Sequence, residues 1–392
     1  PAFFNDEINI PRVLANGCND IREARDYAIE GCVEAQVPGK TDFRPVAGFI
    51  NILKVLELAM HDGVDPKTGR QFGPNTGTME EMDSMEKFMK AYEAQLAYII
   101  DYHLQAYGIC SALHSQICPT VFASCMVDGC IEKGRILQKD GARYSSTGTF
   151  ISGVANAADS LAAIDQVVFQ KKLMTLAELT QILDSNYVGR EDVHQMLLNK
   201  VVHFGNDEDL VDEYCRRVVT FCALENQAHK DSRFGQYELI LLNQTYNIWQ
   251  GRCVGATPDG RMDGEPLANN ASPSNGMDRN GPTAVGNSIG KMDTLMVPKG
   301  VLVNHKFDPA VAKGEKGLEM LETFVRGYCE AGGQHVQINV VDTATLRDAQ
   351  KHPENYKHLM VRVAGYSAFF VELDPRVQEN IIGRTEHGSC CG

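Results

Sequence analysis

The sequence predicts an α/β fold, in the form of a barrel or of a layered sheet. Apolar residues make up 43% of the 392 residues, which is ample for a large core. Helical spacing dominates as far as about residue 230, and short strand patterns then alternate with helices. Such alternation is typical of α/β architectures, and the length fits one large barrel or about two or three domains.

Apolar residues at helical spacing predict the helices of the first part. Asp20 would cap the first helix, and Ile52 and Val55 fall on one face of the second. Residues 65–77 and the Gly/Ser/Thr-rich residues 141–156 are interpreted as loops. The predicted helices cover residues 21–27, 49–61, 80–113, 119–137, 157–170, 174–185, 190–198 and 207–228.

The later part of the chain combines long loops with alternating strands and helices. Residues 251–290 are crowded with Gly, Pro, Asn and Asp, which predicts functional loops on a scaffold. Within them, Arg261 is expected to anchor its own loop. The predicted strands cover residues 294–298, 302–306 and 335–341, and the predicted helices cover residues 315–331, 343–351 and 375–386.

Charge and cysteine usage restrict the class of protein. The net charge of −14 argues against nucleic acid or an anionic membrane as a partner. No apolar run reaches the roughly 20 residues that span a bilayer, and no signal peptide is visible. The twelve cysteines are scattered without a Cys-x-x-Cys pair, so we expect reduced thiols in a cytoplasmic protein and no metal site.

Two short motifs lie far apart in the chain. The first is Gly31-Cys32-Val33-Glu34, in a loop bracketed by Gly and Pro, and the second is the run at 362–366, Arg-Val-Ala-Gly-Tyr, around Gly365. Taken alone, a glycine that interrupts a strand is usually a bulge. Cys32 alone would be a buried structural thiol, and Glu34 a solvated charge. A glycine can also hold an unpaired electron on a planar Cα, because no β-carbon crowds it.

Together and in this order, the two motifs resemble the glycyl radical enzymes. The resemblance covers essentially all of the chain, but family members are about twice as long. We therefore expect a C-terminal half, with residues 1–260 as a Cys-loop and helical barrel part and residues 261–392 as the glycyl radical domain. The other matching segments are residues 256–261 (Ala-Thr-Pro-Asp-Gly-Arg), 265–268 (Glu-Pro-Leu-Ala), 272–273 (Ser-Pro), 281–284 (Gly-Pro-Thr-Ala), 333–339 (Gly-Gln-His-Val-Gln-Ile-Asn) and 381–387 (Ile-Ile-Gly-Arg-Thr-Glu-His).

The resemblance implies a fold and a chemistry. The fold is a ten-stranded α/β barrel of two five-stranded halves, surrounded by helices, with the cysteine and glycine loops meeting inside. Gly365 would store a radical that a separate radical-SAM activating enzyme installs with an iron–sulfur cluster and S-adenosylmethionine. Cys32 would carry it to the substrate as a thiyl, and Glu34 would act as general base. No bound organic cofactor is implied, because the protein carries the radical. A homodimer and an anaerobic cytoplasmic setting, or a microcompartment, are expected.

The residues after the cysteine loop bear on the substrate. Val33 after Cys32 argues against pyruvate formate-lyase, which uses two adjacent cysteines. Glu34 favours the branch of diol dehydratases, choline lyase and isethionate sulfite-lyase. Pro45 and Val46, however, stand where the glycerol dehydratase pattern has His and Asp, so glycerol is not expected.

Four residues are candidates for contact with a small substrate that is anionic or partly apolar. Val46 and Phe49 would line its pocket. Arg44 could pair with a carboxylate or sulfonate, or be a surface charge, and Arg143 is a second, weaker candidate.

The reaction predicted is a radical 1,2-elimination that breaks a carbon–heteroatom bond. One alternative is radical C–C chemistry, such as arylacetate decarboxylation or addition to fumarate. An alternative of another class is a non-catalytic radical carrier that repairs damaged enzymes, or an inactive fragment.

Overall fold

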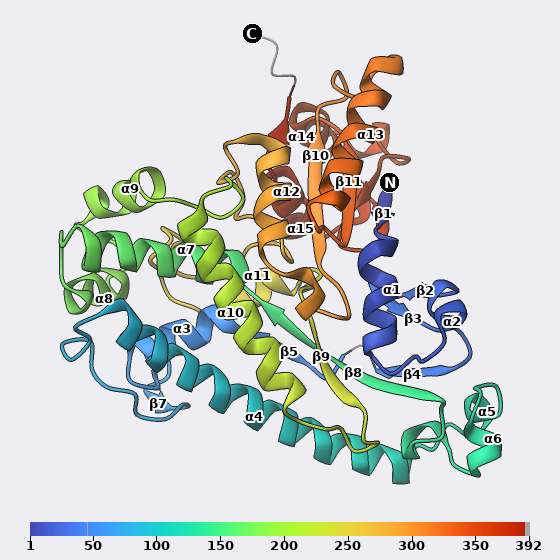
Figure 1. The fold of residues 1–392 in the computed structure, drawn as a ribbon. Coiled ribbons are helices and arrows are strands. Elements are labelled where there is room, and N and C mark those ends of the chain that lie inside the picture. Colours follow the sequence, from blue (N-terminus) through green and yellow to red (C-terminus); the bar gives the residue numbers. More distant parts are fainter. Residues whose placement is uncertain (45, 389–392) are drawn as a thin grey trace.

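The computed structural model describes residues 1–44 and 46–388, and two four-stranded sheets form its centre (Figure 1). In the first sheet, β4 and β5 pair in turn with one edge of β8, and β9 pairs with the opposite edge, all in parallel. In the second, β10 pairs in parallel with β11 and β14, and β1 runs antiparallel to β11. The strands are β1 (Ala2–Phe4), β4 (Thr41–Arg44), β5 (Phe49–Asn51), β8 (Tyr144–Ser152), β9 (Gln236–Ile240), β10 (Leu302–Phe307), β11 (His335–Val340) and β14 (Glu386–His387).

The two sheets join edge to edge between β9 and β10. Leu241 and Val301 form a parallel bridge. Leu241 N donates to Gly300 O at 2.9 Å, and Leu302 N donates to Leu241 O at 3.2 Å. The two sheets therefore share one row of parallel strands with five places. The first place is filled by β4 and β5 together, and the others by β8, β9, β10 and β11. The prediction of an α/β fold is confirmed, and this row corresponds to one five-stranded half of the expected barrel.

Helices cover one face of this row, and the cysteine loop occupies the other. Side chains of Tyr237, Leu239 and Leu241 join the main core beneath the helices, whereas Ile240 and Leu242 pack in the cluster that contains Cys32. This is the alternation expected of a strand buried on both faces. The covering helices are α3 (Ile52–Met60), α4 (Met85–Ile117), α7 (Val154–Ile164) and α10 (Asp209–Gln227).

The remaining helices surround this centre. Those before the second sheet are α1 (Asp6–Ala15), α2 (Ile21–Arg25), α5 (Val121–Ser124), α6 (Cys130–Lys133), α8 (Leu176–Asp184), α9 (Glu191–Lys200), α11 (Tyr246–Gly251) and α12 (Gly281–Lys291). Those that follow are α13 (Gly314–Glu330), α14 (Thr343–Lys351) and α15 (Pro375–Ile382).

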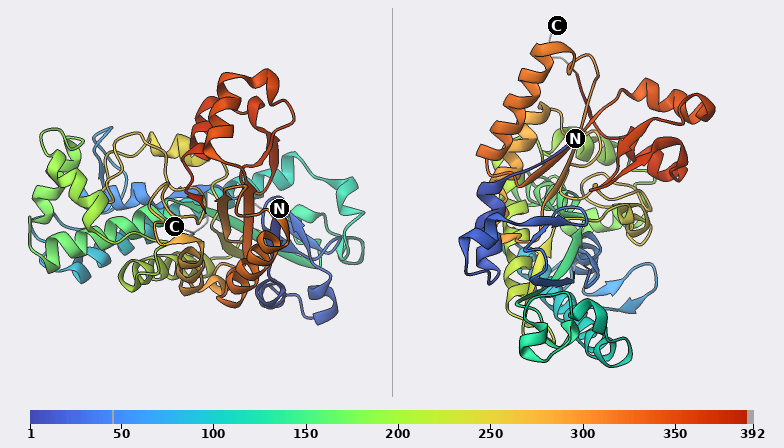
Figure 2. Two further views of the ribbon diagram at one scale, coloured as in Figure 1. Left: turned by 90° about the horizontal axis from the view of Figure 1, so that it is seen from above. Right: turned by 90° about the vertical axis from the view of Figure 1, so that its right-hand side faces the viewer.

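Residues 341–382 form a C-terminal lobe with a hydrophobic core of its own. Figure 2 shows this segment in red, standing beside the central sheet. Within it, β12 (Met360–Arg362) and β13 (Ser367–Phe369) form an antiparallel hairpin, and α14 and α15 pack nearby. Gly365 lies at the turn of the hairpin.

The structure corrects several predicted elements. Residues 141–156 were predicted as a loop, which is wrong, because β8 is the central strand of its sheet. The predicted strand at 294–298 is also wrong, since Thr294–Met296 form a 3₁₀ turn. The predicted helix at 119–137 is broken, because Gly129 and Gly134 adopt left-handed φ angles of 94° and 60°. β9, α11 and α12 were not predicted.

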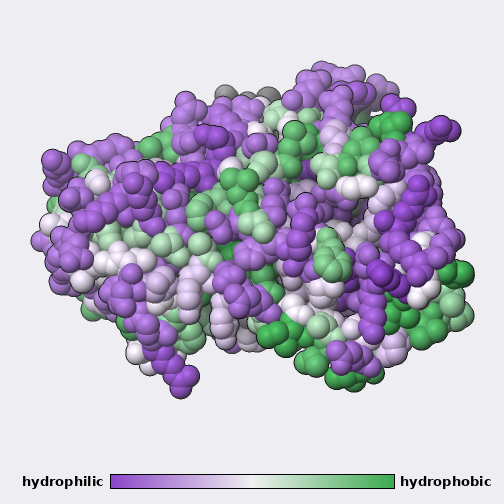
Figure 3. All heavy atoms as spheres, turned by 60° about the horizontal axis from the view of Figure 1, so that its bottom comes forward, coloured by the Kyte–Doolittle hydropathy of each residue, from purple (hydrophilic) through white to green (hydrophobic). Residues whose placement is uncertain are grey.

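The outer surface carries exposed apolar side chains on α4 and the segment after it. None of the helices that the structure describes is long and apolar enough to cross a membrane. Figure 3 shows apolar surface at the α5–α6 end of the face that carries α4. The exposed apolar residues here are Ile109, Leu113, Ile117, Val121, Phe122, Met126 and Ile131.

Candidate active site

The cysteine loop is a tight hairpin on the inner side of the sheets. Strands β2 (Ala28–Glu30) and β3 (Glu34–Gln36) pair antiparallel, and Glu30 lies opposite Glu34. Gly31 begins the turn with a φ of 62°, a left-handed conformation that glycine adopts without strain. The turn places Cys32 and Val33 in a buried apolar cluster with Ala364. Ala364 belongs to the β12–β13 hairpin of residues 360–369, which is called the glycine hairpin below.

The glycine hairpin meets the cysteine loop tip to tip. Val363 N donates to Tyr366 O at 2.9 Å, which closes the turn around Ala364 and Gly365. Gly365 has a φ of 78°, and a β-carbon there would lie 2.1 Å from Cys32 Cβ and 2.5 Å from Cys32 Sγ. Cys32 Sγ donates to Ala364 O at 3.2 Å. Only glycine fits this position, and two motifs from opposite ends of the chain are in contact.

Glu34 is buried beside the thiol. Its side chain is 2% exposed, and its Oε2 accepts hydrogen bonds from Cys32 N and Val33 N, each at 2.8 Å. Burial raises the pKa of Glu34, and the two backbone N–H groups oppose the shift. Burial, and then the charge of Glu34, raises the pKa of Cys32 to about 11. Cys32 is therefore an S–H thiol at neutral pH and not a thiolate.

Aromatic side chains line the inner face next to Cys32. Phe49 packs against the Cys32 cluster, with its ring centroid 4.9 Å from that of Phe150 and 4.7 Å from that of Tyr246. Gln244 Nε2 approaches Cys32 Sγ at 4.0 Å. Sequence reasoning missed Gln244, because it lies in a loop whose path depends on the preceding strand β9, which was not predicted.

Gln337 is a second residue that the motifs did not reveal. Its Oε1 accepts a hydrogen bond from Gly365 N at 3.0 Å. Gln337 and Asn339 occupy alternate positions of β11, so they share one face of a buried strand. Polar residues at alternate positions of an otherwise apolar strand were the available signal.

The structure brings Cys32, Glu34, Phe49 and Gly365 together, but not the two candidate arginines. Arg44 Nη1 donates to Ser111 Oγ on α4 at 2.5 Å, so its side chain lies on the helix-covered side of the sheet. Arg143 is paired with Glu23 at 3.1 Å.

Two further positions bear on the predicted substrate, the candidate Val46 and the neighbouring Pro45. Val46 is 47% exposed. Pro45 lies outside the described residues. The role of Arg44, Arg143 and Val46 in substrate binding stays a prediction.

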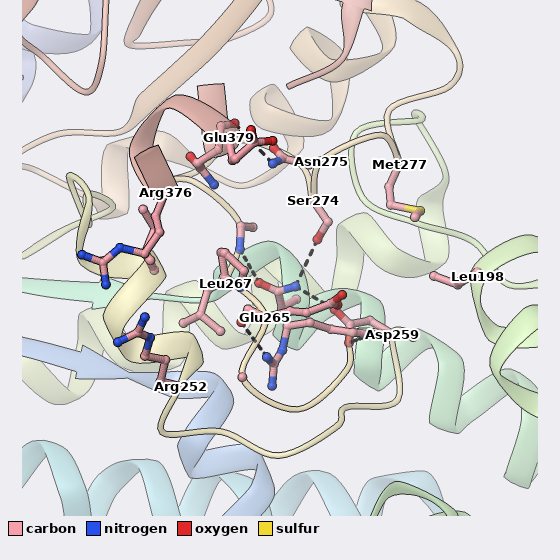
Figure 4. Close-up of a pocket in the computed structure, with 18 of the residues that line it drawn as sticks. Leu198, Arg252, Asp259, Glu265, Leu267, Ser274, Asn275, Met277, Arg376 and Glu379 are labelled. Atoms are coloured by element: carbon pink, nitrogen blue, oxygen red, sulfur yellow. Dashed lines mark hydrogen bonds between the residues drawn. The ribbon is translucent and has the colours of Figure 1, made fainter. Parts of the chain in front are cut away.

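A pocket of about 630 Å³ lies away from this contact, between the loop after α11 and α15 (Figure 4). Arg261 forms part of its wall, and its guanidinium donates to the carbonyls of Met262 and Glu265 at 2.9 and 2.7 Å, which confirms its predicted anchoring role. The lining does not include Cys32, Glu34 or Gly365. Among the described residues, no group of three or more His, Cys, Asp or Glu side chains is placed to hold a metal ion.

Comparison with known proteins agrees with this geometry. The chain is 38% identical to trans-4-hydroxy-L-proline dehydratase of Clostridioides difficile, over 98% of this chain and 48% of that protein. It is 34% identical to (2S)-3-sulfopropanediol dehydratase of Klebsiella oxytoca, over 98% and 47%. The glycerol-bound B12-independent glycerol dehydratase from Clostridium butyricum superimposes with a TM-score of 0.95 at 42% identity, over 99% of this chain and 49% of that one.

The chain thus spans about half the length of the relatives it matches. Family models match both of its parts. Residues 1–251 match the pyruvate formate lyase-like model, and residues 267–371 match the glycine radical model. The predicted division at residue 260 stays a prediction. With Cys32 set against Gly365 and both models matched, the chain belongs to the pyruvate formate lyase-like family of glycyl radical enzymes.

Proposed function

We propose that this chain carries the radical machinery of a lyase that eliminates a heteroatom group from a small substrate. The observation that supports it most is the contact of Cys32 with Gly365, where a β-carbon on Gly365 would lie 2.5 Å from Sγ. The names of its relatives, which are dehydratases for hydroxyproline, sulfopropanediol and glycerol, support the reaction class.

Gly365 stores the radical, and Cys32 passes it to the substrate. The Gly365 Cα radical takes the hydrogen atom of the Cys32 S–H bond, so that a Cα–H bond forms, the S–H bond breaks and the unpaired electron moves to sulfur. No proton or charge is transferred in this step. The raised pKa of Cys32 supports the assignment, because a hydrogen-atom donor must keep its S–H bond at neutral pH.

Glu34 then acts as the base for the substrate radical. The thiyl takes a hydrogen atom from a substrate carbon that bears a hydroxyl group, and the carboxylate accepts the hydroxyl proton as the neighbouring leaving group departs with its bonding electrons. Both loop N–H groups bond to Oε2, which leaves Oε1 to meet the substrate. The two hydrogen bonds keep a carboxylate available despite burial.

The partners follow from this chemistry. A separate radical-SAM activating enzyme, with an iron–sulfur cluster and S-adenosylmethionine, installs the radical on Gly365. The resemblance to the family further suggests a homodimer, and no bound organic cofactor is proposed, because the protein itself carries the radical. The aromatic surface formed by Phe49 and Tyr246 supports a substrate that is partly apolar.

The same aromatic surface favours one second candidate, radical C–C chemistry such as arylacetate decarboxylation. An aryl group could pack on the Phe49 ring, which already stacks with Tyr246. Assays of the activated protein with choline, isethionate, hydroxyproline and propanediol, set beside arylacetates, separate the two reaction classes.

Electron paramagnetic resonance after anaerobic activation tests the proposal. The native protein is expected to show a doublet from the single remaining Cα hydrogen of Gly365, and Gly365→Ala is expected to lose it. Cys32→Ser is expected to keep the doublet and to lose turnover. A doublet that survives in Gly365→Ala, or full turnover in Cys32→Ser, contradicts the assignment.

A further inference from the structure

The amide of Gly365 is held by one side chain of the barrel. Gln337 is 1% exposed on β11. Its Oε1 accepts from Gly365 N at 3.0 Å and from Arg362 Nε at 3.2 Å. Its Nε2 donates to Asn304 Oδ1 and to Val363 O, the latter at 3.4 Å. Two donors on the oxygen and two acceptors on the nitrogen fix the orientation of the amide.

A chain of amide side chains stands behind this contact. Asn269 Oδ1 accepts from Asn304 Nδ2, and Asn304 Oδ1 accepts from Gln337 Nε2. Each bond polarises the next, so the Gln337 oxygen is a stronger acceptor toward Gly365 than an isolated amide would be. The chain runs from the loop before α12 through β10 and β11 to the glycine hairpin.

The other anchors of the hairpin do not touch Gly365. Asn339 accepts from Arg362 N at 2.8 Å and donates to Arg362 O at 2.9 Å. Arg384 donates to Arg362 O at 3.1 Å and to Val363 O at 2.7 Å. Gln337 alone among these three side chains therefore reaches the residue that carries the radical.

A glycyl radical shares its unpaired electron between Cα, the amide nitrogen and the carbonyl. An acceptor on the N–H draws the proton outward and increases donation from the nitrogen lone pair into the half-filled orbital, which moves spin from Cα to nitrogen. We propose that Gln337 is a positioning residue that sets the spin distribution of the Gly365 radical and its alignment with the Cys32 sulfur. The inference rests on the proposed function, because it requires the radical to lie on Gly365.

The test compares three variants after anaerobic activation. In Gln337→Leu the acceptor is removed, so the nitrogen hyperfine coupling measured by pulsed spectroscopy on ¹⁵N-labelled protein is expected to fall. In Gln337→Glu one oxygen replaces Nε2 and must keep a proton to face Asn304 Oδ1 and Val363 O, so the other oxygen is a weaker acceptor than the native amide and the coupling is expected to fall by less than in Gln337→Leu. Asn339→Ala removes an anchor of the hairpin without touching Gly365, and its coupling is expected to equal the native one.

A second readout needs no substrate. In D₂O the Cys32 thiol carries deuterium, and reversible transfer between sulfur and Cα replaces the Gly365 hydrogen, which collapses the doublet. Misalignment in Gln337→Leu is expected to slow this collapse by about 10- to 100-fold at equal spin concentration. Should Gln337→Leu fail to fold or to accept a radical, the nearly isosteric Gln337→Glu still decides the question through the sign of its shift.

The outcomes separate the two proposals. A native protein without a doublet, or with one that persists in Gly365→Ala, overturns the proposed function and this inference with it. If the native protein shows the doublet, and if the nitrogen coupling in both Gln337→Leu and Gln337→Glu equals the native value, the inference alone is overturned. If the nitrogen coupling changes equally in Asn339→Ala and Gln337→Leu, Gln337 is only a structural anchor of the hairpin.

Discussion

At the scale of single residues, Glu34 combines a buried carboxyl group with two backbone hydrogen bonds. Glu34→Gln keeps an oxygen that can accept the N–H groups of Cys32 and Val33, but it cannot accept a proton. We expect kcat to fall by about 10²- to 10⁴-fold, the usual contribution of a general base, while the doublet is unchanged. Turnover and spin concentration measured on the same activated sample check this.

The pH dependence of Glu34 gives a second test of the same role. Burial raises its pKa above 4.5, so the acid is protonated, and inactive as a base, over a wider acidic range. We expect kcat/KM of the native protein to fall as pH drops through this raised pKa, and Glu34→Gln to lack that fall. Glu30, opposite Glu34 in the hairpin, supplies the control, because Glu30→Gln removes a nearby charge and keeps the base. Equal losses in both variants would contradict the role.

The three residues proposed to react could be chosen as candidates from sequence, whereas the side chains that contact them could not. Cys32, Glu34 and Gly365 stand in motifs whose order is informative without coordinates. Gln337 and Gln244 make contacts between segments far apart in sequence. Nothing local distinguishes Gln244 from other polar residues, and the alternation of polar residues in β11 points to a shared face for Gln337 without revealing its contact with Gly365. Arg44 is a candidate that the sequence suggested but that the structure places elsewhere. Its charge suited an anionic substrate, but the alternation of side chains along β4 turns it toward α4.

At the scale of elements, β8 shows why strand prediction failed at the centre of the sheet. Its residues are rich in Ser, Thr and Gly, a composition typical of loops. The strand is nevertheless buried, because β4, β5 and β9 supply partners on both edges, and Thr147 donates to Asp231 at 2.8 Å. Long amphipathic helices such as α4 carry their own signal, whereas β8 depends on neighbours that no local pattern reveals.

The glycine hairpin depends on Arg384, a buried side chain outside the hairpin itself. Its guanidinium bonds to the carbonyls of Arg362 and Val363. Arg384→Met keeps most of the volume but removes both hydrogen bonds, so residues 360–369 are expected to open more often. We expect amide hydrogen exchange there to accelerate by about 10- to 100-fold, since hydrogen bonds to charged groups are worth about 1.5–3 kcal/mol.

Arg376 provides the matched control for Arg384. It lies at the start of α15 and pairs with Asp374 at 2.7 Å on the surface. Arg376→Met is expected to leave exchange in the hairpin unchanged, because exposed ion pairs contribute little. Equal acceleration in both variants would show that loss of charge, not loss of the carbonyl contacts, loosens the hairpin.

The C-terminal strand β14 is linked to the loop before α12 by a buried acid. Thr385 donates to Asp278, and burial raises the pKa of Asp278 from 3.8 to about 6. His387 lies 3.6 Å away, but burial lowers its pKa to about 4, so it is neutral at pH 7 and offers no charge.

Asp278 therefore makes stability fall as pH rises. The folded state binds the proton more tightly, so the stabilisation is complete below pH 3.8 and is lost as pH rises through about 6. Asp278→Asn is neutral at every pH and keeps an acceptor for Thr385. We expect it to raise the free energy of unfolding at pH 7.5 by about 1–3 kcal/mol relative to its effect at pH 4. Urea denaturation at the two pH values checks this, and a gain that is the same at both pH values would contradict it.

At the scale of the whole molecule, the two sheets meet where a buried ion pair lies. Lys299 precedes the segment that bridges to β9, and its Nζ lies 3.2 Å from Glu238 Oε2, with both side chains at most 3% exposed. Glu238 lies on the same face of β9 as Ile240, the face directed toward the cysteine loop. The pair therefore stands between the two sheets that position Cys32 and Gly365.

Removing one partner of this pair is expected to lower the free energy of unfolding strongly, whereas removing both partners is expected to lower it little. Lys299→Met leaves the Glu238 carboxylate buried, and we expect the free energy of unfolding to fall by about 3–5 kcal/mol at neutral pH. Since burial already raises the pKa of Glu238, the loss is expected to shrink at low pH, where the acid is protonated, and to grow as pH rises through that pKa. The double variant Lys299→Met/Glu238→Leu removes both charges of this pair and is expected to recover most of the lost stability. If urea denaturation finds the double variant as unstable as the single one, the cost lies in packing at the junction of the sheets and not in an unpaired charge.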